Sequence, residues 1–278
     1  MDERSAAILD GIRGLPAITF TATMRNPRSS ADRTFHGPTL YDYAVATGLF
    51  PAKLGGGKLA NSYFVVTAED GARSAVALAE VWPNAAAKQV ILAYEQDGEP
   101  IRNGVRLVLT GDWLAGRSIG GVVSIEAKSV EAAPAAGDGL ELAGLLDRPG
   151  PVDLASLPAE AHIEVTTVAA SGHGGAPIDP RRYGGVRLYA LLEQAGICLD
   201  PDQHEDFLGK VVVASSADGH AVVIAGGEIE PRFQNGDVIL ATTQDGVPIE
   251  DGPRLIVPFD RKPGRWAKRI TRIELRQA

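Results

Sequence analysis

A cluster of basic side chains near the carboxyl end of the chain offers the clearest chemistry in this sequence. The chain as a whole is acidic, with 35 aspartate and glutamate residues against 27 lysine and arginine residues and a formal net charge of −8. Against that background, the final segment gathers Lys262, Arg265, Lys268, Arg269 and Arg272. Lysine and arginine donate charge-assisted hydrogen bonds to phosphate and carboxylate oxygens. The cluster therefore predicts an anion or phosphate site, or else a solvated strand edge whose charges oppose aggregation.

A glycine-rich segment with a histidine is the second candidate. Ser171–Gly175 reads SGHGG and places His173 among glycines. The backbone N–H groups of such a loop can bind an anion, and an imidazole can bind a metal or donate a proton. The strand–GxxxxGK[ST]–helix context of a phosphate-binding loop does not accompany the segment. A flexible loop is therefore the alternative interpretation.

The other residue types give little support for metal-centred catalysis. Cys198 is the single cysteine, which excludes an internal disulfide and a multi-cysteine metal site. The five histidines show no HxH or HxxxH spacing. We expect Cys198 to fill a core position or to begin a loop.

Length and composition place the chain among globular proteins with room for two domains. It has 278 residues, of which 45% are apolar and 22% are charged. The negative charge argues against a nucleic-acid partner, and no apolar run approaches the roughly 18 residues of a membrane span. The first residues, MDERSAAILDGIRG, lack the basic and apolar regions of a signal peptide. We expect a cytoplasmic protein, or a periplasmic or secreted one if a leader has been removed.

Two segments of the chain repeat one construction. Val90–Leu109, VILAYEQDGEPIRNGVRLVL, has its counterpart in Val238–Val257, VILATTQDGVPIEDGPRLIV. The Gln-Asp-Gly turn begins at Gln96 in one and at Gln244 in the other. Every residue of the first segment is separated from its counterpart in the second by this same distance along the chain, the offset of the two copies. A constant offset over a long stretch indicates two copies of one fold, because loops otherwise accumulate insertions. We therefore predict a tandem duplication. Its parts are a first repeat over residues 1–128, a linker over 129–150 and a second repeat over 151–278.

Short strands and few helices are expected in each repeat, which gives an α+β class with mixed, mostly antiparallel sheets. Leu40, Tyr43 and Ala44 have the i, i+3, i+4 spacing of a short helix that Gly48 ends. The linker is expected to be irregular, although Leu140–Leu146 could form a short helix. The first repeat is further expected to have strands at Ile18–Thr23, Tyr63–Thr67, Ser74–Leu78 and Val122–Ala127, and loops at Arg25–Thr34 and Lys53–Lys58. The second repeat follows the same order, with strands at Ile163–Val168, Val211–Ser215, Ala221–Ala225 and Ile270–Leu275.

Several motifs of the repeats resemble a known family. The second repeat contains Gly252–Pro258, GPRLIVP, followed by the basic stretch Gly264–Ile270, GRWAKRI. Before its helix, Tyr183–Leu188 reads YGGVRL, and the first repeat has Phe35–Leu40, FHGPTL, at the corresponding place. Together these motifs resemble the sulfite-oxidase-type molybdopterin domains, over about the whole of each repeat. The resemblance implies the mixed α+β fold of that family, occurring twice.

The resemblance also implies a set of cofactor-binding residues. That family holds the phosphate of its pterin with arginine, lysine and serine side chains around the late basic stretch. The matching residues here are Arg254, Arg265, Lys268 and the neighbouring Arg269 in the second repeat, and Arg106, Arg117 and Ser118 in the first. His173 lies in the loop where the family has its metal ligand.

One departure from the family concerns the metal. Its catalytic members ligate molybdenum through a cysteine just after the opening strand. The corresponding segments here are Thr21–Asn26 and Thr166–Ser171, which contain no cysteine. A thiolate is the soft donor on which such a site depends. The resemblance therefore leaves a molybdopterin as a candidate cofactor, but argues against molybdenum and against sulfite-oxidase-type catalysis.

Three functions remain as hypotheses. The first is a non-catalytic binding module, whose degenerate cofactor site takes a small anionic molecule or a protein partner. The second is a molybdopterin-dependent oxidoreductase with unusual metal ligation. The third is a structural or interaction protein without a ligand, in which the two repeats pack face to face.

Overall fold

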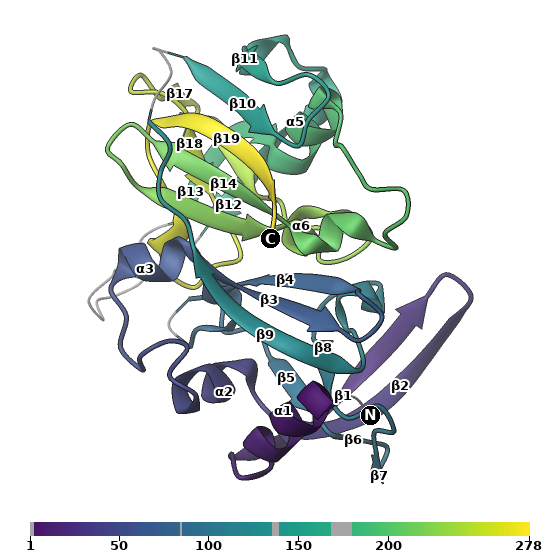
Figure 1. The fold of residues 1–278 in the computed structure, drawn as a ribbon. Helices are drawn as coiled ribbons and strands as arrows, with labels where there is room; N and C mark the ends of the chain where they lie inside the picture. Colours follow the sequence, from purple (N-terminus) through teal and green to yellow (C-terminus); the bar gives the residue numbers. More distant parts are fainter. Residues whose placement is uncertain (1–2, 84, 135–138, 168–179) are drawn as a thin grey trace.

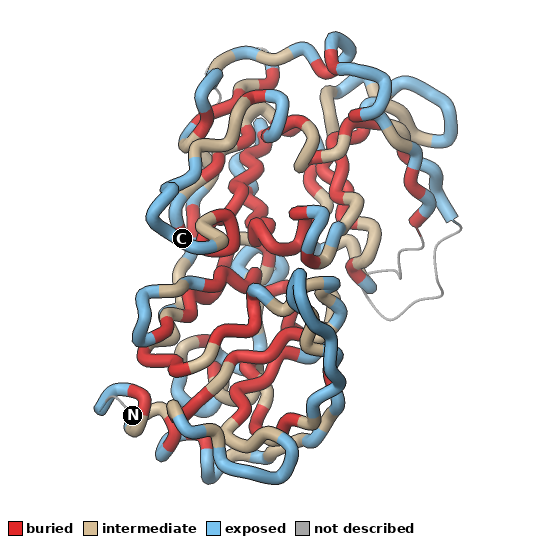
Figure 2. The backbone as a smooth tube through the Cα atoms, turned by 90° about the vertical axis from the view of Figure 1, so that its right-hand side faces the viewer, coloured by how far each residue is buried: buried red, intermediate tan, exposed pale blue. Residues whose placement is uncertain are grey.

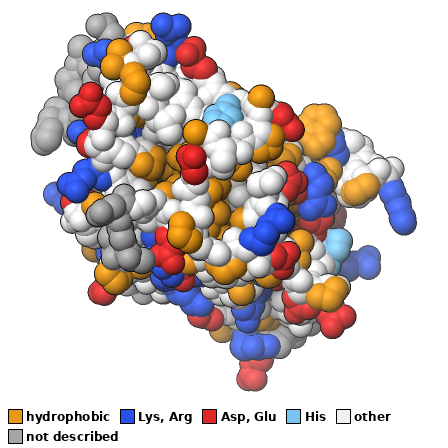
Figure 3. Space-filling model, turned by 90° about the horizontal axis from the view of Figure 1, so that it is seen from above, with side chains coloured by type: hydrophobic (Ala, Val, Ile, Leu, Met, Phe, Trp, Pro, Cys, Tyr) orange, Lys and Arg blue, Asp and Glu red, His pale blue; other side chains and the backbone are white. Residues whose placement is uncertain are grey.

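The computed structural model describes residues 3–83, 85–134, 139–167 and 180–278. It confirms the α+β class: mostly antiparallel sheets and a few short helices make up two bodies, one above the other in Figure 1. Within the described ranges, no helix is long and apolar enough to cross a membrane. The face shown in Figure 3 carries basic and acidic side chains interspersed, with hydrophobic side chains between them.

The chain up to Ser129 forms the lower body of Figure 1. Its strands are β1 (Ala17–Asn26), β2 (Ser29–Pro38), β6 (Glu95–Gln96) and β7 (Glu99–Pro100) in one sheet, β5 (Val90–Ala93) and β8 (Arg106–Leu109) in a second, and β4 (Arg73–Ala77), β3 (Ser62–Ala68) and β9 (Val122–Ser129) in a third. Its helices are α1 (Glu3–Arg13), α2 (Leu40–Ala46), α3 (Gly56–Ala60), α4 (Leu78–Val81) and the 3-10 turn η1 (Ala115–Arg117). The Thr39 hydroxyl caps α2 by accepting a hydrogen bond from the backbone N–H of Asp42 at 2.9 Å.

The chain from Leu140 forms the upper body. One sheet has the order β11 (Gly150–Val152), β10 (Leu140–Gly144), β19 (Ile270–Gln277), β14 (Lys210–Ser216) and β15 (Ala221–Ala225). The other has β12 (His162–Thr167), β13 (Arg181–Arg187), β16 (Ile239–Gln244) and β17 (Val247–Pro248), with β18 (Arg254–Ile256) also paired to β16. Its helices are α5 (Leu188–Ala195), α6 (Gly226–Ile229) and the 3-10 turns η2 (Leu154–Ser156), η3 (Ala159–Ala161), η4 (Asp206–Gly209) and η5 (Pro263–Arg265).

Several elements recur at a constant distance along the chain. β3 and β14, β4 and β15, α4 and α6, η1 and η5, and β9 and β19 all keep the offset that separates Gln96 from Gln244, at both of their ends. A Cβ atom at Gly37 would lie 2.1 Å from the carbonyl oxygen of Leu92, and one at Gly185 would lie 2.1 Å from that of Leu240. Only glycine allows the backbones to approach so closely at these two positions.

The two bodies meet through the faces of two sheets. Sheet β4–β3–β9 of the lower body and strands β14 and β15 of the upper body share one apolar cluster. Its buried members include Tyr63, Val65, Ala75 and Ala77 on one side and Val211, Val213, Val223 and Ala225 on the other. Each body also has a larger core of its own, and Figure 2 shows buried segments running through both bodies up to their contact. Apolar burial therefore fixes the two bodies against each other.

The polar segment Arg25–Thr34, expected to be a loop, is instead the outer part of a long β-hairpin. β1 and β2 pair without interruption from Ala17 and Pro38 to Asn26 and Ser29. Polar side chains stabilise the exposed strands across the ladder, because the Thr23 hydroxyl donates to Asp32 at 2.7 Å. The hydrophilic composition of the segment concealed these pairs.

Two further expectations about local structure are wrong. Leu140–Leu146 contains strand β10 rather than a short helix, and β10 pairs in parallel with β19. Leu140 and Leu142 lie two positions apart on one face of this strand, and both are buried in the core of the upper body. The glycine-rich Lys53–Lys58 runs into helix α3, whose Ala60 is buried.

Candidate functional site

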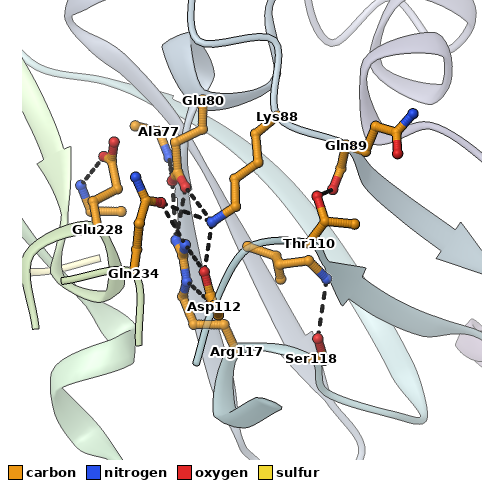
Figure 4. A network of polar contacts seen from close by, with 12 residues as sticks. Ala77, Glu80, Lys88, Gln89, Thr110, Asp112, Arg117, Ser118, Glu228 and Gln234 are labelled. Carbon is orange, nitrogen blue, oxygen red and sulfur yellow. Dashed lines mark hydrogen bonds and ion pairs between the residues drawn. The ribbon is translucent and has the colours of Figure 1, made fainter. Parts of the chain in front are cut away.

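A buried arginine lies at the contact between the two bodies. Arg117 at the end of η1 is fully buried. Its Nε and Nη2 donate to the two carboxylate oxygens of Asp112 at 2.7 and 2.9 Å, and its Nη1 donates to Glu80 of α4 at 2.9 and 3.2 Å (Figure 4). Every guanidinium nitrogen therefore donates to a carboxylate. The geometry is the bidentate one that arginine favours.

The same arrangement occurs at the equivalent place in the upper body. Arg265 at the end of η5 donates from Nε and Nη2 to Asp260 at 2.9 and 2.7 Å, and from Nη1 to Glu228 of α6 at 2.8 and 2.9 Å. Its exposed fraction is 1%. In both bodies the glutamate also accepts a hydrogen bond from the backbone at the start of its helix. These backbone hydrogen bonds fix the position of each glutamate carboxylate independently of its arginine.

Burial and charge act in opposite directions on these groups. Burial alone would lower the pKa values of Arg117 and Arg265, but their carboxylate partners outweigh it, so both pKa values lie above the usual range of arginine. Burial would likewise raise the pKa of Asp112, yet Arg117 and Lys88 hold it below its ordinary value. For Glu228 burial prevails over the attraction of Arg265 and raises the pKa to about 7.

One lysine makes the two clusters unequal. Lys88 Nζ donates to Asp112 at 2.6 Å and to the side-chain oxygen of Gln234 at 2.8 Å, and lies 3.7 Å from Glu80 (Figure 4). Gln234 belongs to the upper body, so Lys88 connects the bodies through a polar contact. The pKa of Lys88 is lowered, first by burial and then by the nearby Arg117. The equivalent position of the upper body holds a glycine, Gly236.

An open cavity of about 790 Å³ lies beside this network, between the bodies. Three segments line it, one from β1, one from the end of β8 onward and one from the loop after α6. Their lining residues are Thr21, Ala22, Thr23 and Arg25, then Leu109, Thr110, Gly111, Asp112 and Trp113, then Pro231, Phe233, Gln234 and Asn235. Backbone hydrogen bonds hold the two bodies together along its edge, since the N–H of Trp113 donates to Phe233 O at 2.9 Å. The volume is in the range of small-molecule sites, roughly 300–1,000 Å³.

The wall of this cavity combines a cation, an aromatic ring and hydroxyl groups. The guanidinium carbon of Arg25 lies 3.6 Å from the ring centroid of Trp113, a cation–π contact. The indole remains 61% exposed. Thr21 and Thr23 of β1 also line the cavity and contribute hydroxyl groups.

Of the predicted cofactor residues, Lys268 lies in a second cavity. This cavity of about 400 Å³ is also lined by His220, Trp266 and residues of α3 in the lower body. Arg269, the residue after Lys268, is exposed and has a left-handed backbone, with a φ of 53°. Arg265 lies apart from this surface, because its side chain is enclosed by Glu228 and Asp260.

The other predicted residues lie in separate environments. Arg254 donates to the side chains of Gln244 at 3.0 Å and Asp251 at 3.3 Å. Arg106 is half-buried, and burial lowers its pKa. The Ser118 hydroxyl is buried and accepts a hydrogen bond from Leu109 N at 3.1 Å. The last of the set, His173, falls outside the described residues.

Sequence reasoning missed the carboxylates that surround the two arginines. The constant offset along the chain contained the necessary signal. Three pairs of identical residues keep it: Glu80 and Glu228, Asp112 and Asp260, and Arg117 and Arg265. No comparable signal marks Arg25 and Trp113, whose side chains meet only through the fold. In the part of the chain that the structure describes, no three His, Cys, Asp or Glu side chains gather in a way that could hold a metal ion.

Comparison with known proteins gives a limited result. No protein-family model matches the chain, and a search of curated proteins finds no match. Among solved structures, the sulfane dehydrogenase SoxCD from Paracoccus pantotrophus is similar, with 21% sequence identity and a TM-score of 0.38. The similarity covers 56% of this chain and 43% of that one. The chain thus spans less than half the length of the protein to which it is similar.

Proposed function

We propose that this chain is a non-catalytic binding module that takes a small anionic molecule in the cavity between its two bodies. In this proposal each body is a copy of a sulfite-oxidase-type molybdopterin domain, and the cavity is the degenerate cofactor site of the first copy. The observation that carries the proposal is the position of the cavity. It is lined by Thr21, Thr23 and Arg25, in the segment where the resemblance places the metal-binding cysteine.

The internal pairing of two arginines supports loss of the original cofactor site. Arg117 and Arg265 stand where the resemblance implies contacts to a pterin phosphate, yet each gives its donors to two carboxylates. A phosphate would have to displace a buried carboxylate, and separating a buried ion pair is costly because it leaves a charge without a partner. The proposed ligand therefore contacts other groups.

The repeated elements support the two-copy part of the proposal. Five pairs of elements share one offset along the chain, and the two arginine clusters share it as well. An ancestral dimer whose subunits became joined would give this pattern. The apolar contact between the sheets, with Val65 opposite the equivalent Val213 in one cluster, fits such an origin.

The test is native mass spectrometry and elemental analysis of the protein purified from its own host. We expect a bound small molecule and no stoichiometric molybdenum. A variant that fills the cavity, Thr21→Trp, should lose the added mass. Thr19→Trp is the matched control, because Thr19 is exposed on the same face of β1 two residues away and does not line the cavity.

Two results would contradict the proposal. Molybdenum near one atom per chain, together with a pterin mass, would make the protein an oxidoreductase with unusual ligation. A bound mass that survives in Thr21→Trp would place the ligand elsewhere. The second cavity is then the next candidate, because the exposed Lys268 lines it. Lys268→Gln would weaken binding at that site, whereas Arg102→Gln, at an exposed position in the lower body, would not.

A structural role is the second candidate function, and one observation favours it. The sheet faces of both bodies are buried against each other in a shared apolar cluster, so the bodies already serve as partners. If the purified chain carries no small molecule and binds none of the anions offered to it, this role replaces the binding module. A protein partner would then be sought by cross-linking in the native host.

A further inference from the structure

The stacked pair Arg25 and Trp113 differs from the other arginine sites described above. Arg117 and Arg265 give their N–H donors to carboxylates, whereas Arg25 lies with its guanidinium over the face of an indole. A ring face attracts the cation without using its in-plane N–H groups. Among the described residues, none accepts a hydrogen bond from the Arg25 side chain. Its donors therefore remain free for an anion at the wall of the cavity.

The charge of the cavity wall is set by this single group. Asp112 also lines the cavity, but its carboxylate accepts hydrogen bonds from Arg117 and Lys88 and is neutralised by them. Among the described lining residues, Arg25 is then the one cation without a carboxylate partner. The wall offers one positive charge, which matches a monoanion better than a dianion.

Gln234 supplies a second donor whose direction is fixed. Its side-chain oxygen accepts hydrogen bonds from Lys88 at 2.8 Å and from Arg117 at 3.3 Å. Both partners can only donate, so the amide cannot be reversed, and its NH₂ group must lie on the other side. Within the described ranges the NH₂ group of Gln234 has no hydrogen-bond partner. The network thus fixes the orientation of a side chain that lines the same cavity as Arg25.

We propose that the ligand is a planar organic monocarboxylate. This inference rests on the proposed function and names the chemistry of its ligand. The carboxylate binds the planar fork of Arg25, which matches its two oxygens, and the NH₂ group of Gln234 provides a further donor. The organic body occupies the rest of the cavity, against the exposed surface of Trp113. A cavity of about 790 Å³ is far larger than an inorganic anion requires.

The experiment is a titration of the full chain with three probes: naphthalene-2-carboxylate, the neutral naphthalene-2-carboxamide and inorganic phosphate. Binding is followed by calorimetry and by tryptophan fluorescence. We expect the carboxylate to bind one per chain and to change the fluorescence, and the change to disappear in Trp113→Phe. The carboxamide and phosphate should bind at least tenfold more weakly.

Variants in the β1–β2 hairpin test whether Arg25 binds the carboxylate of the ligand. Arg25→Met should weaken carboxylate binding at least tenfold, and Arg25→Lys should restore only part of it, because lysine lacks the planar fork. Arg28→Met is the matched control, since Arg28 is exposed at the turn of the same hairpin and does not line the cavity. Its affinity should equal that of the unchanged chain.

The outcomes separate this inference from the function on which it rests. Tighter binding of phosphate than of the carboxylate, abolished by Thr21→Trp, would overturn the monocarboxylate and leave the cavity as an anion site. Equal binding of the carboxylate and the carboxamide would also overturn it, because charge recognition would be absent. If none of the probes binds and the purified chain carries no small molecule, both proposals fail.

Discussion

Arg117 and Arg265 occupy equivalent positions in the two bodies and have the same partners: each donates to a glutamate from the helix after the hairpin and to an aspartate that precedes it in the same loop. Both are enclosed at the contact between the two bodies. Arg117 also packs on the upper body, since a Cβ atom at Gly227 would lie 2.1 Å from its Cδ atom. These arginines belong to the interior of the protein, which changes what their removal should do.

Removing the charge of Arg265 should destabilise the fold. Arg265→Met leaves Glu228 and Asp260 buried without a partner, and breaking such a pair costs about 3–5 kcal/mol in free energy of unfolding. Urea unfolding followed by circular dichroism measures the loss. Arg102→Met, at an exposed position, is the control and should change stability by less than about 0.5 kcal/mol. An Arg265→Met variant as stable as the control would show that the ion pair contributes little.

Lys88 should matter less to stability than Arg117, although both bind Asp112. In Lys88→Met the carboxylate keeps its two hydrogen bonds from Arg117, so no buried charge is left alone. We expect a loss of about 1–3 kcal/mol, against about 3–5 kcal/mol for Arg117→Met. Thermal and urea unfolding of the two variants check the order. The reverse order would mean that Lys88, and not Arg117, neutralises the carboxylates.

Sequence patterns predicted the fold where apolar alternation was strong. The hairpin of β3 and β4, the helix capped by Thr39 and the strand β19 fall close to the expected residues, because each buries an apolar face. Of the hairpin of β1 and β2, only the strand at Ile18–Thr23 was predicted, and β2 was missed. The outer strands of the hairpin are stabilised by polar side chains such as Thr23 and Asp32, which carry no hydrophobic period.

The candidate site was harder to predict than the fold. Basic residue types alone suggested Arg265 and Lys268 as one anion site, but η5 directs Arg265 into the interior while Lys268 faces a cavity. The surroundings of an arginine depend on residues distant in sequence. Trp113 and Arg25 are far apart along the chain, and only the closure of β1 against the loop after β8 brings them into contact.

The stability of the protein should fall as pH rises through neutrality because of Glu228. Burial raises the pKa of this carboxyl to about 7 in the folded chain, from about 4.3 in an unfolded chain. The folded chain therefore binds the proton more tightly, so this group favours folding most below pH 4 and its contribution is lost as pH rises through 7. Urea unfolding at pH 5 and pH 8 measures the difference, and Glu228→Gln should reduce it. An unchanged difference in the variant would assign the pH dependence to another group.

Adding a methyl group at Gly37 in the lower body, or at Gly185 in the upper body, should destabilise the fold. A Cβ atom at Gly37 or at Gly185 would meet a backbone carbonyl oxygen at 2.1 Å, and neither backbone can move without breaking a strand pairing. We expect Gly37→Ala and Gly185→Ala each to lose at least about 1–3 kcal/mol, the usual range of overpacking. Gly11→Ala in α1 is the matched control, because nothing lies within 4 Å of its added Cβ and alanine favours a helix by about 0.5–1 kcal/mol. The denaturant concentration at the midpoint of unfolding should therefore fall in the Gly37 and Gly185 variants and rise in Gly11→Ala. If Gly37→Ala is as stable as the unchanged chain, β2 and β5 lie farther apart than the structure places them.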